Sequence, residues 1–182
     1  MDSLASLFSL STLSVRAAEA QLLSLNEKSQ EYGLTLTPED AVALMQTRVQ
    51  ALNASGRVEI GSATVGRLAE AFCDSCWINQ THYAETLHEL VELFYEMKNE
   101  TEDRVSDAEL IAFMKECFED RCGGSLELLS GRELEKLAEN VRFGAADYFD
   151  LSRETRFEED RFAEEEEAGE RDSGLTEEGG YE

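Results

Sequence analysis

The sequence predicts an all-α fold: a compact bundle of about five to six helices with short loops and a disordered acidic C-terminal tail. Three observations support this prediction. Apolar residues recur at intervals of three and four along most of the chain. Residues typical of helix starts and stops separate these stretches. Pro, which breaks helices, occurs once in 182 residues.

The first two predicted helices have clear ends. One runs from residue 4 or 14 to residue 32, and Gly33 is suited to end it. The next spans residues 38–54. Thr37 can accept a bond from an early backbone N–H, Pro38 suits the first helical position, and Gly56 provides the stop.

The middle of the chain predicts a connector at residues 58–60, a Ser62-capped helix to residue 72, and a Thr81-capped helix over 82–99. One face of the latter helix is apolar. That face comprises Leu87, Leu90, Val91, Phe94 and Met97, whereas Glu85, Glu89, Glu92 and Glu96 lie on wetter faces.

Two capping boxes mark the last predicted helices, Ser106–Glu109 and Ser130–Glu133, with a single helical turn at 125–129 between them. The apolar face of the first of these helices comprises Leu110, Ile111, Phe113, Met114, Cys117 and Phe118; that of the second comprises Leu134, Leu137, Ala138 and Val141. No internal repeat is detected. We therefore expect a helical domain over residues 1–146, with an N-terminal helix at about 4–32 and a core at about 34–146.

The charge of the chain indicates which part is disordered and which partners are excluded. The formal net charge is −24, and residues 147–182 hold 15 acids and four arginines, a net of −11. This composition predicts a disordered tail, because it buries too little apolar surface to offset the entropy of ordering. So negative a surface argues against direct nucleic-acid binding, and no apolar run is long enough for a membrane span. Since the N-terminus lacks the basic and apolar regions of a signal peptide, a cytoplasmic location is expected.

The four cysteines are the sharpest lead to chemistry. Cys73 and Cys76 form a C-x-x-C pair, and Cys117 and Cys122 form a C-x₄-C pair. Four such thiolates could bind zinc, or the first pair could act in redox chemistry. Against this, Cys117 lies on the apolar face of its helix, where free Cys is a common core residue. The first pair also follows a helix C-terminus, which disfavours a thiolate.

Other motifs are incomplete. Glu85 and His88 share a helical face, but two histidines in the chain are too few for a di-iron bundle or a zincin. Residues 61–68 resemble a phosphate-binding loop only in their glycines. We therefore predict no catalytic residue, no cofactor and no enzymatic activity.

Aromatic residues suggest a contact with a partner. Trp77, with Tyr83 nearby, lies in or beside the connector before the long helix, and Trp is a frequent anchor at interfaces. Trp77 could equally fold back over helix ends. Phe143, Tyr148 and Phe149 follow the last helix and could dock on the core or engage another chain.

Several segments resemble a family of uncharacterised bacterial proteins, a domain of unknown function. They are residues 71–75, 83–87, 92–95, 98–101 and 122–127. The resemblance covers about residues 30–142 and implies a partner encoded beside the protein. It implies no activity, cofactor or catalytic residue. The family often has Pro where this chain has Cys76, which weakens the zinc interpretation.

These observations favour a non-enzymatic, intracellular protein-binding adaptor or regulatory subunit, whose acidic surface would attract a basic partner. One alternative is a small zinc- or thiol-dependent protein that uses Cys73, Cys76, Cys117 and Cys122. A weaker alternative is an acidic mimic of nucleic acid. The sequence predicts neither the partner's identity nor the oligomeric state.

Overall fold

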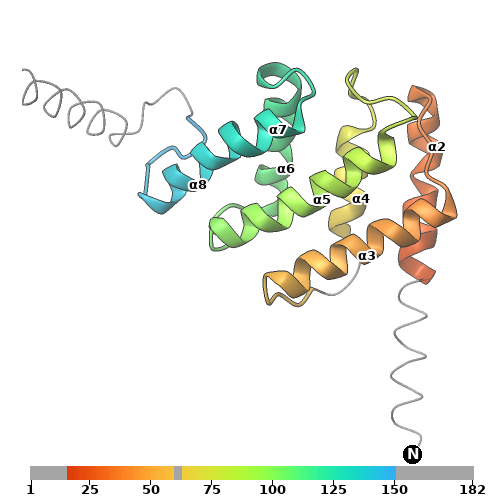
Figure 1. Cartoon of the computed structure of the whole chain (residues 1–182), viewed down its shortest axis with the longest axis horizontal. Coiled ribbons are helices and arrows are strands. Elements are labelled where there is room, and N and C mark those ends of the chain that lie inside the picture. The colour runs from red at the N-terminus through yellow and green to blue at the C-terminus, as the bar shows by residue number, and fades with distance from the viewer. Residues whose placement is uncertain (1–15, 60–62, 151–182) are drawn as a thin grey trace, which may run out of the picture.

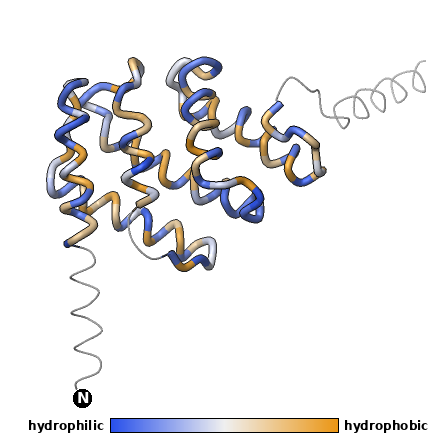
Figure 2. Tube along the Cα trace, turned by 180° about the vertical axis from the view of Figure 1, so that it is seen from behind, coloured by the Kyte–Doolittle hydropathy of each residue, from blue (hydrophilic) through white to orange (hydrophobic). Residues whose placement is uncertain are grey.

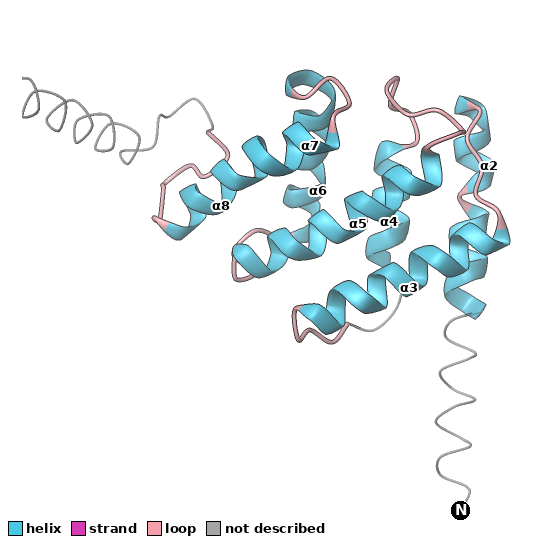
Figure 3. Cartoon of the chain, in the orientation of Figure 1, coloured by secondary structure: helices cyan, strands magenta, loops and turns pink. Residues whose placement is uncertain are grey.

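The computed structural model describes residues 16–59 and 63–150. Helices and loops make up these residues, and none of them lies in a strand (Figure 3), so the predicted all-α class is confirmed. The predicted helix start at residue 4 or 14, the Ser62 cap and the tail beyond residue 150 lie outside the described residues. Besides a helical stretch at 16–24, the elements are α2 (Asn26–Ser29), η1 (Gln30–Tyr32), α3 (Pro38–Ala54), α4 (Ala63–Phe72), α5 (Tyr83–Glu100), α6 (Asp107–Glu116), η2 (Cys117–Arg121), α7 (Leu126–Leu128), η3 (Leu129–Leu134) and α8 (Glu135–Arg142).

The helices form two layers that cross each other (Figure 1). The first layer holds residues 16–32, α4 and α6, and the second holds α3, α5 and the helix that runs through α7, η3 and α8. Hydrophobic and hydrophilic residues alternate along most of the helices (Figure 2), because each helix buries one side between or within the layers.

Neighbouring helices within a layer run in the same direction. In the first layer, Arg67 of α4 pairs with Asp107 at the start of α6, and Asp74 just after α4 pairs with Lys115 near the end of α6.

In the second layer, Thr47 of α3 bonds His88 of α5 at 2.7 Å, while Arg48 bonds Tyr95, further along α5, at 3.2 Å. Glu100 at the end of α5 pairs with Arg142 at the end of α8 at 3.0 Å. The fold is therefore a stack of three helical hairpins, the arrangement of a short α-solenoid.

The predicted cap at Thr37 and the predicted capping box at Ser106 are both present, and Thr37 also forms a capping box with Asp40. Thr37 accepts a hydrogen bond from the Asp40 N–H at 3.1 Å, and Ser106 accepts one from the Glu109 N–H at 3.3 Å. Gly33 ends η1 with φ +75°, as its predicted stop role requires. The apolar faces predicted for 87–97, 110–118 and 134–141 are buried.

Two predicted helix starts are wrong. His82, and not Thr81, is the N-cap residue of α5, and its side chain makes no capping bond. Ser130 lies inside η3 and starts no helix; the helix starts earlier, where Ser125 accepts a bond from the Leu128 N–H at 3.2 Å. Glu133 is buried and pairs with Arg132 at 2.6 Å instead of capping.

A buried ion network joins the loops at one end of the stack. The ammonium of Lys98, 5 % exposed, donates to the Val105 carbonyl at 2.7 Å and lies 3.1 Å from Asp103 and 3.2 Å from Asp107. Arg57 also pairs with Asp103, and Arg67 with Asp107. The network fixes the turn between α5 and α6 against α4 and the α3–α4 connector.

The residues after α8 fold back on the stack. The ring of Phe149 lies 5.2 Å from that of Phe113 in α6, and the buried Asn140 amide donates to the Tyr148 carbonyl at 3.2 Å. Tyr148 and Phe149 thus dock on the core, whereas Phe143 is 56 % exposed. No helix among residues 16–59 and 63–150 is long and apolar enough to cross a membrane.

Candidate functional site

Trp77 folds back over the turn after η2, which is one of the two arrangements that the sequence left open. Its ring and Cβ lie over the turn at Gly123 and Gly124, which adopt φ values of +56° and +83°. A Cβ on Gly124 would lie 2.5 Å from the Trp77 Cβ, so only glycine fits beneath the tryptophan. Trp77 nevertheless stays 53 % exposed and keeps a face that a partner can reach.

Tyr83, the second residue predicted at this contact, is 1 % exposed. Burial, with a smaller effect from the nearby Cys73, raises the pKa of its hydroxyl to about 12. In this conformation its ring packs in the core and offers no surface to a partner.

The four cysteines do not form one site. All are free; Cys76 is exposed and the other three are buried. Among the residues that the structure describes, no three His, Cys, Asp or Glu side chains are grouped so as to hold a metal ion.

The surroundings of the buried cysteines also keep their thiols protonated. Burial, helped by the negative charge of Glu133, raises the pKa of the Cys117 thiol to about 12. Burial likewise raises the pKa values of Cys73 and Cys122. Zinc binding and thiol exchange both need the thiolate, so these surroundings give no support to either chemistry.

An acidic stripe on α5 is the most extensive candidate site among the described residues. The carboxylates recur every three or four residues and therefore share one side of the helix, opposite its buried face. All five are exposed: Glu85, Glu89, Glu92, Glu96 and Glu100. At 1.5 Å per residue, neighbouring residues of the stripe are about 4.5–6 Å apart along the helix axis.

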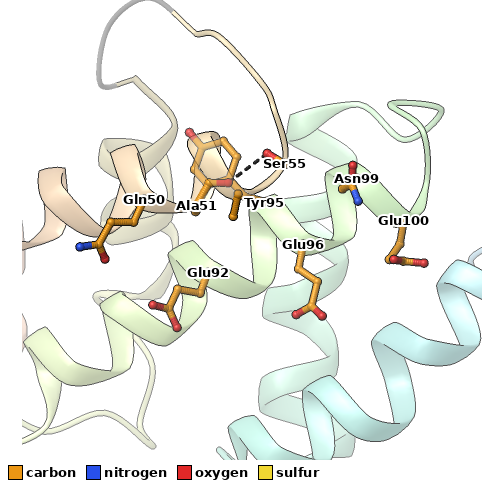
Figure 4. A pocket seen from close by; sticks show the side chains of 9 residues that line it. Gln50, Ala51, Ser55, Glu92, Tyr95, Glu96, Asn99 and Glu100 are labelled. Carbon is orange, nitrogen blue, oxygen red and sulfur yellow. Dashed lines mark hydrogen bonds between the residues drawn. The ribbon is translucent and has the colours of Figure 1, made fainter.

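A groove of about 460 Å³ lies between the stripe and the C-terminal end of α3 (Figure 4). The α3 side is made of small or neutral groups, and the α5 side carries three carboxylates. The lining residues are Gln50, Ala51, Ala54, Ser55, Glu92, Tyr95, Glu96, Asn99 and Glu100. In the close-up, Glu92, Glu96 and Glu100 follow one another along α5.

A second groove, of about 350 Å³, lies on the other side of α5, against η3 and α8. Glu96 and Glu100 line this groove too, and Glu135 and Glu139 add carboxylates from α8. Its lining cation, Arg142, is already paired with Glu100. Glu96 and Glu100 therefore form a shared wall between two acidic grooves.

The backbone adds to the negative potential of the first groove. Both α3 and α5 end beside it, and the C-terminus of a helix carries a partial negative charge. The last turn of α3 contains no basic residue to balance that charge. Among the described residues, Glu92 and Glu96 have no hydrogen-bond or ion-pair partner. The groove is thus an unbalanced anionic surface.

Comparison with protein families places residues 21–147 in a family of unknown function, DUF6323. The chain belongs to this family. The family region includes all the residues that line the two grooves, and it confirms the resemblance predicted for residues 30–142. No curated protein and no solved structure matches the chain.

Proposed function

We propose that the protein is a non-enzymatic adaptor or regulatory subunit that binds a partner protein through the partner's basic surface. One observation carries this proposal: the acidic stripe of α5 lies between two grooves, and Glu135 and Glu139 of α8 add further carboxylates to the second of them. The surface is extended and is built on α3, α5 and α8, which are neighbouring helices of the second layer. Such arrays commonly bind partners along one layer of helices.

The row of like charges favours a partner with several basic residues, because no single exposed ion pair binds tightly. An exposed ion pair contributes about 0.2–1 kcal/mol, so several pairs must act together. A field of one sign also speeds the encounter with an oppositely charged partner and disfavours acidic competitors. Trp77, half exposed and held by the Gly123–Gly124 turn, supplies an apolar anchor elsewhere on the same protein.

The test is capture of partners from the native cell, with wild-type protein and a stripe variant compared side by side. We expect Glu92→Gln/Glu96→Gln/Glu100→Gln to lose the captured partner, and wild-type binding to weaken as ionic strength rises from about 0.05 to about 0.5 M. The matched control is Glu31→Gln/Glu116→Gln/Glu127→Gln. It changes the net charge equally at exposed acids outside both grooves.

Equal loss with both triple variants would mean that net charge alone attracts the partner, and the stripe would lose its assigned role. Capture that resists salt and both variants would remove the acidic surface from the proposal altogether.

A nucleic-acid mimic is the second candidate, favoured by the regular spacing of the α5 carboxylates. It requires that duplex DNA compete for the captured partner. If DNA displaces the partner from the wild-type protein, and the partner itself binds DNA, mimicry replaces the adaptor proposal. If DNA has no effect, mimicry fails.

A further inference from the structure

We propose that the two grooves bind two basic side chains of one extended partner segment, with Lys or Arg at positions i and i+3. This inference rests on the proposed function and adds the form of the ligand. Its occupant is a peptide segment of a protein, chosen because both grooves are lined by carboxylates and by apolar side chains and share Glu96 and Glu100.

The first groove fits the two parts of a lysine or arginine side chain. Ala51 and Ala54 give it a low apolar wall, against which an aliphatic stem can lie. Glu92 and Glu96 provide unpaired carboxylates for the cationic head. The end of α3, with no basic residue of its own, adds the partial charge of its carbonyls.

The second groove repeats this chemistry on the other side of α5. Leu93, Leu134 and Ala138 line it with apolar groups, and Glu135 and Glu139 supply carboxylates from α8. Because Arg142 already neutralises Glu100, the carboxylates of α8 are the main attraction for a second cation here.

The separation of the grooves sets the spacing of the two cations. The grooves flank a single helix, so their centres are separated by about one interhelical distance, 8–10 Å. In a polyproline II segment, residues i and i+3 point to the same side and lie about 9.3 Å apart, at 3.1 Å per residue. In a β-strand, residues i and i+2 share a side but span only about 6.6 Å. A polyproline II segment with basic residues three positions apart therefore fits best.

The experiment uses the full chain and four blocked, fluorescently labelled lysine peptides, measured by anisotropy at low salt. Two lysines are adjacent, or two, three or seven positions apart; the last peptide is rich in alanine so that it can form a helix. We expect the three-position peptide to bind at least about fivefold more tightly than the adjacent-lysine peptide.

Single substitutions in each groove then test whether the two lysines of the peptide occupy different grooves. Glu92→Gln touches only the first groove and Glu139→Gln only the second. Each should weaken the three-position peptide roughly two- to fivefold, the range of one exposed ion pair. The matched control, Glu116→Gln, lies in neither groove and should leave the affinity unchanged. All three side chains are exposed, and circular dichroism checks that each variant is folded.

The possible failures are distinguishable. If both groove variants weaken every peptide equally whatever its spacing, the two-groove inference is wrong while the adaptor proposal stands. Tightest binding by the seven-position peptide would replace the extended segment with a helix and overturn the inference. If spermidine displaces the three-position peptide as well as the unlabelled peptide does, cation attraction suffices and the inference also fails. Peptide binding that no groove variant changes would count against both proposals.

Discussion

At the scale of single residues, the contact between Trp77 and Gly124 joins two connectors that are far apart in the sequence. The left-handed conformation of Gly124 and the 2.5 Å approach that a Cβ would make to Trp77 both demand glycine. The contact holds the α4–α5 connector against the turn after η2, and so sets how Trp77 faces the solvent.

We predict that Gly124→Ala destabilises the protein by roughly 1–3 kcal/mol, the usual cost of a strained backbone, before any further cost from displacing Trp77. Urea unfolding measures the effect. Gly131→Ala is the control, because a Cβ there meets nothing within 4 Å and the residue lies in a helix. It should be neutral or stabilising by up to about 1 kcal/mol. Equal stability of the two variants would contradict the close contact.

At the scale of elements, short-range signals were enough for many helix boundaries. Thr37 and Ser106 cap as predicted, because a capping bond involves residues only three positions apart. The Thr81 prediction is one residue too early, because the first helical bond of α5 runs from the Thr86 N–H to the His82 carbonyl at 2.8 Å, which makes His82 the N-cap residue. Ser130 failed because buried contacts of Glu133 with Arg132 and Arg121 keep that segment helical.

The candidate site was predictable only in part. The acidic spacing of α5 is visible in the sequence, and its acids are exposed as expected. The grooves depend on which helices flank α5, and the residues on their two sides are 30 positions or more apart, so they leave no local sequence pattern. The burial of Tyr83 also depends on packing between distant segments. Its place in the sequence, six residues after Trp77, therefore gave no sign that its ring lies in the core.

The ion network around Lys98 predicts a pH dependence of stability. A hydrogen bond from Arg57 holds the pKa of Asp103 below its ordinary value of 3.8. Burial opposes the same effect at Asp107, but hydrogen bonds from Lys98 and Arg67 outweigh it and also lower the pKa. The unfolded chain thus binds protons more readily, so this stabilisation is complete above pH 3.8 and is lost as the pH falls through the lower, folded-state pKa.

We expect Asp103→Asn/Asp107→Asn to lower the free energy of unfolding at pH 7 by roughly 1–3 kcal/mol, with a reduced share from Asp103 because it is half exposed. The difference from the wild type should shrink as the pH drops below about 4. Urea titrations at pH 7, 5 and 3 measure it, with Glu31→Gln/Glu127→Gln as the control. A difference that is constant with pH would rule out the charged network as its source.

At the scale of the whole molecule, each hairpin of the stack packs against its neighbours. A hairpin at the end of the stack has a neighbour on one side only, so its other apolar face must be covered by another segment. Residues 148–150 provide it at the C-terminal end, where Phe149 lies on Phe113 and Asn140 holds the backbone. Residues 148–150 therefore lie beside α6 and α8.

Truncation tests this end. A chain that stops at residue 150 should unfold within about 0.5 kcal/mol of the full chain, because the removed segment is rich in acids and carries few large apolar side chains. A chain that stops at residue 146 should be less stable by about 1–3 kcal/mol, since it loses the burial of two aromatic side chains. Thermal or urea unfolding distinguishes them. Equal stability of both shortened chains would show that the aromatic cover contributes nothing.

The wide turn of η3 is where this molecule can vary in length. In η3, six residues occupy a π-helical turn that keeps both Leu129 and Leu134 buried. A π-turn holds about one residue more than an α-turn, so removing one residue and tightening the turn to an ordinary α-helix would leave the rotation of α8 nearly unchanged. Glu135 and Glu139 would then stay in their groove. A single-residue deletion in the regular helix of α8 would instead rotate everything after it by about 100° and damage recognition.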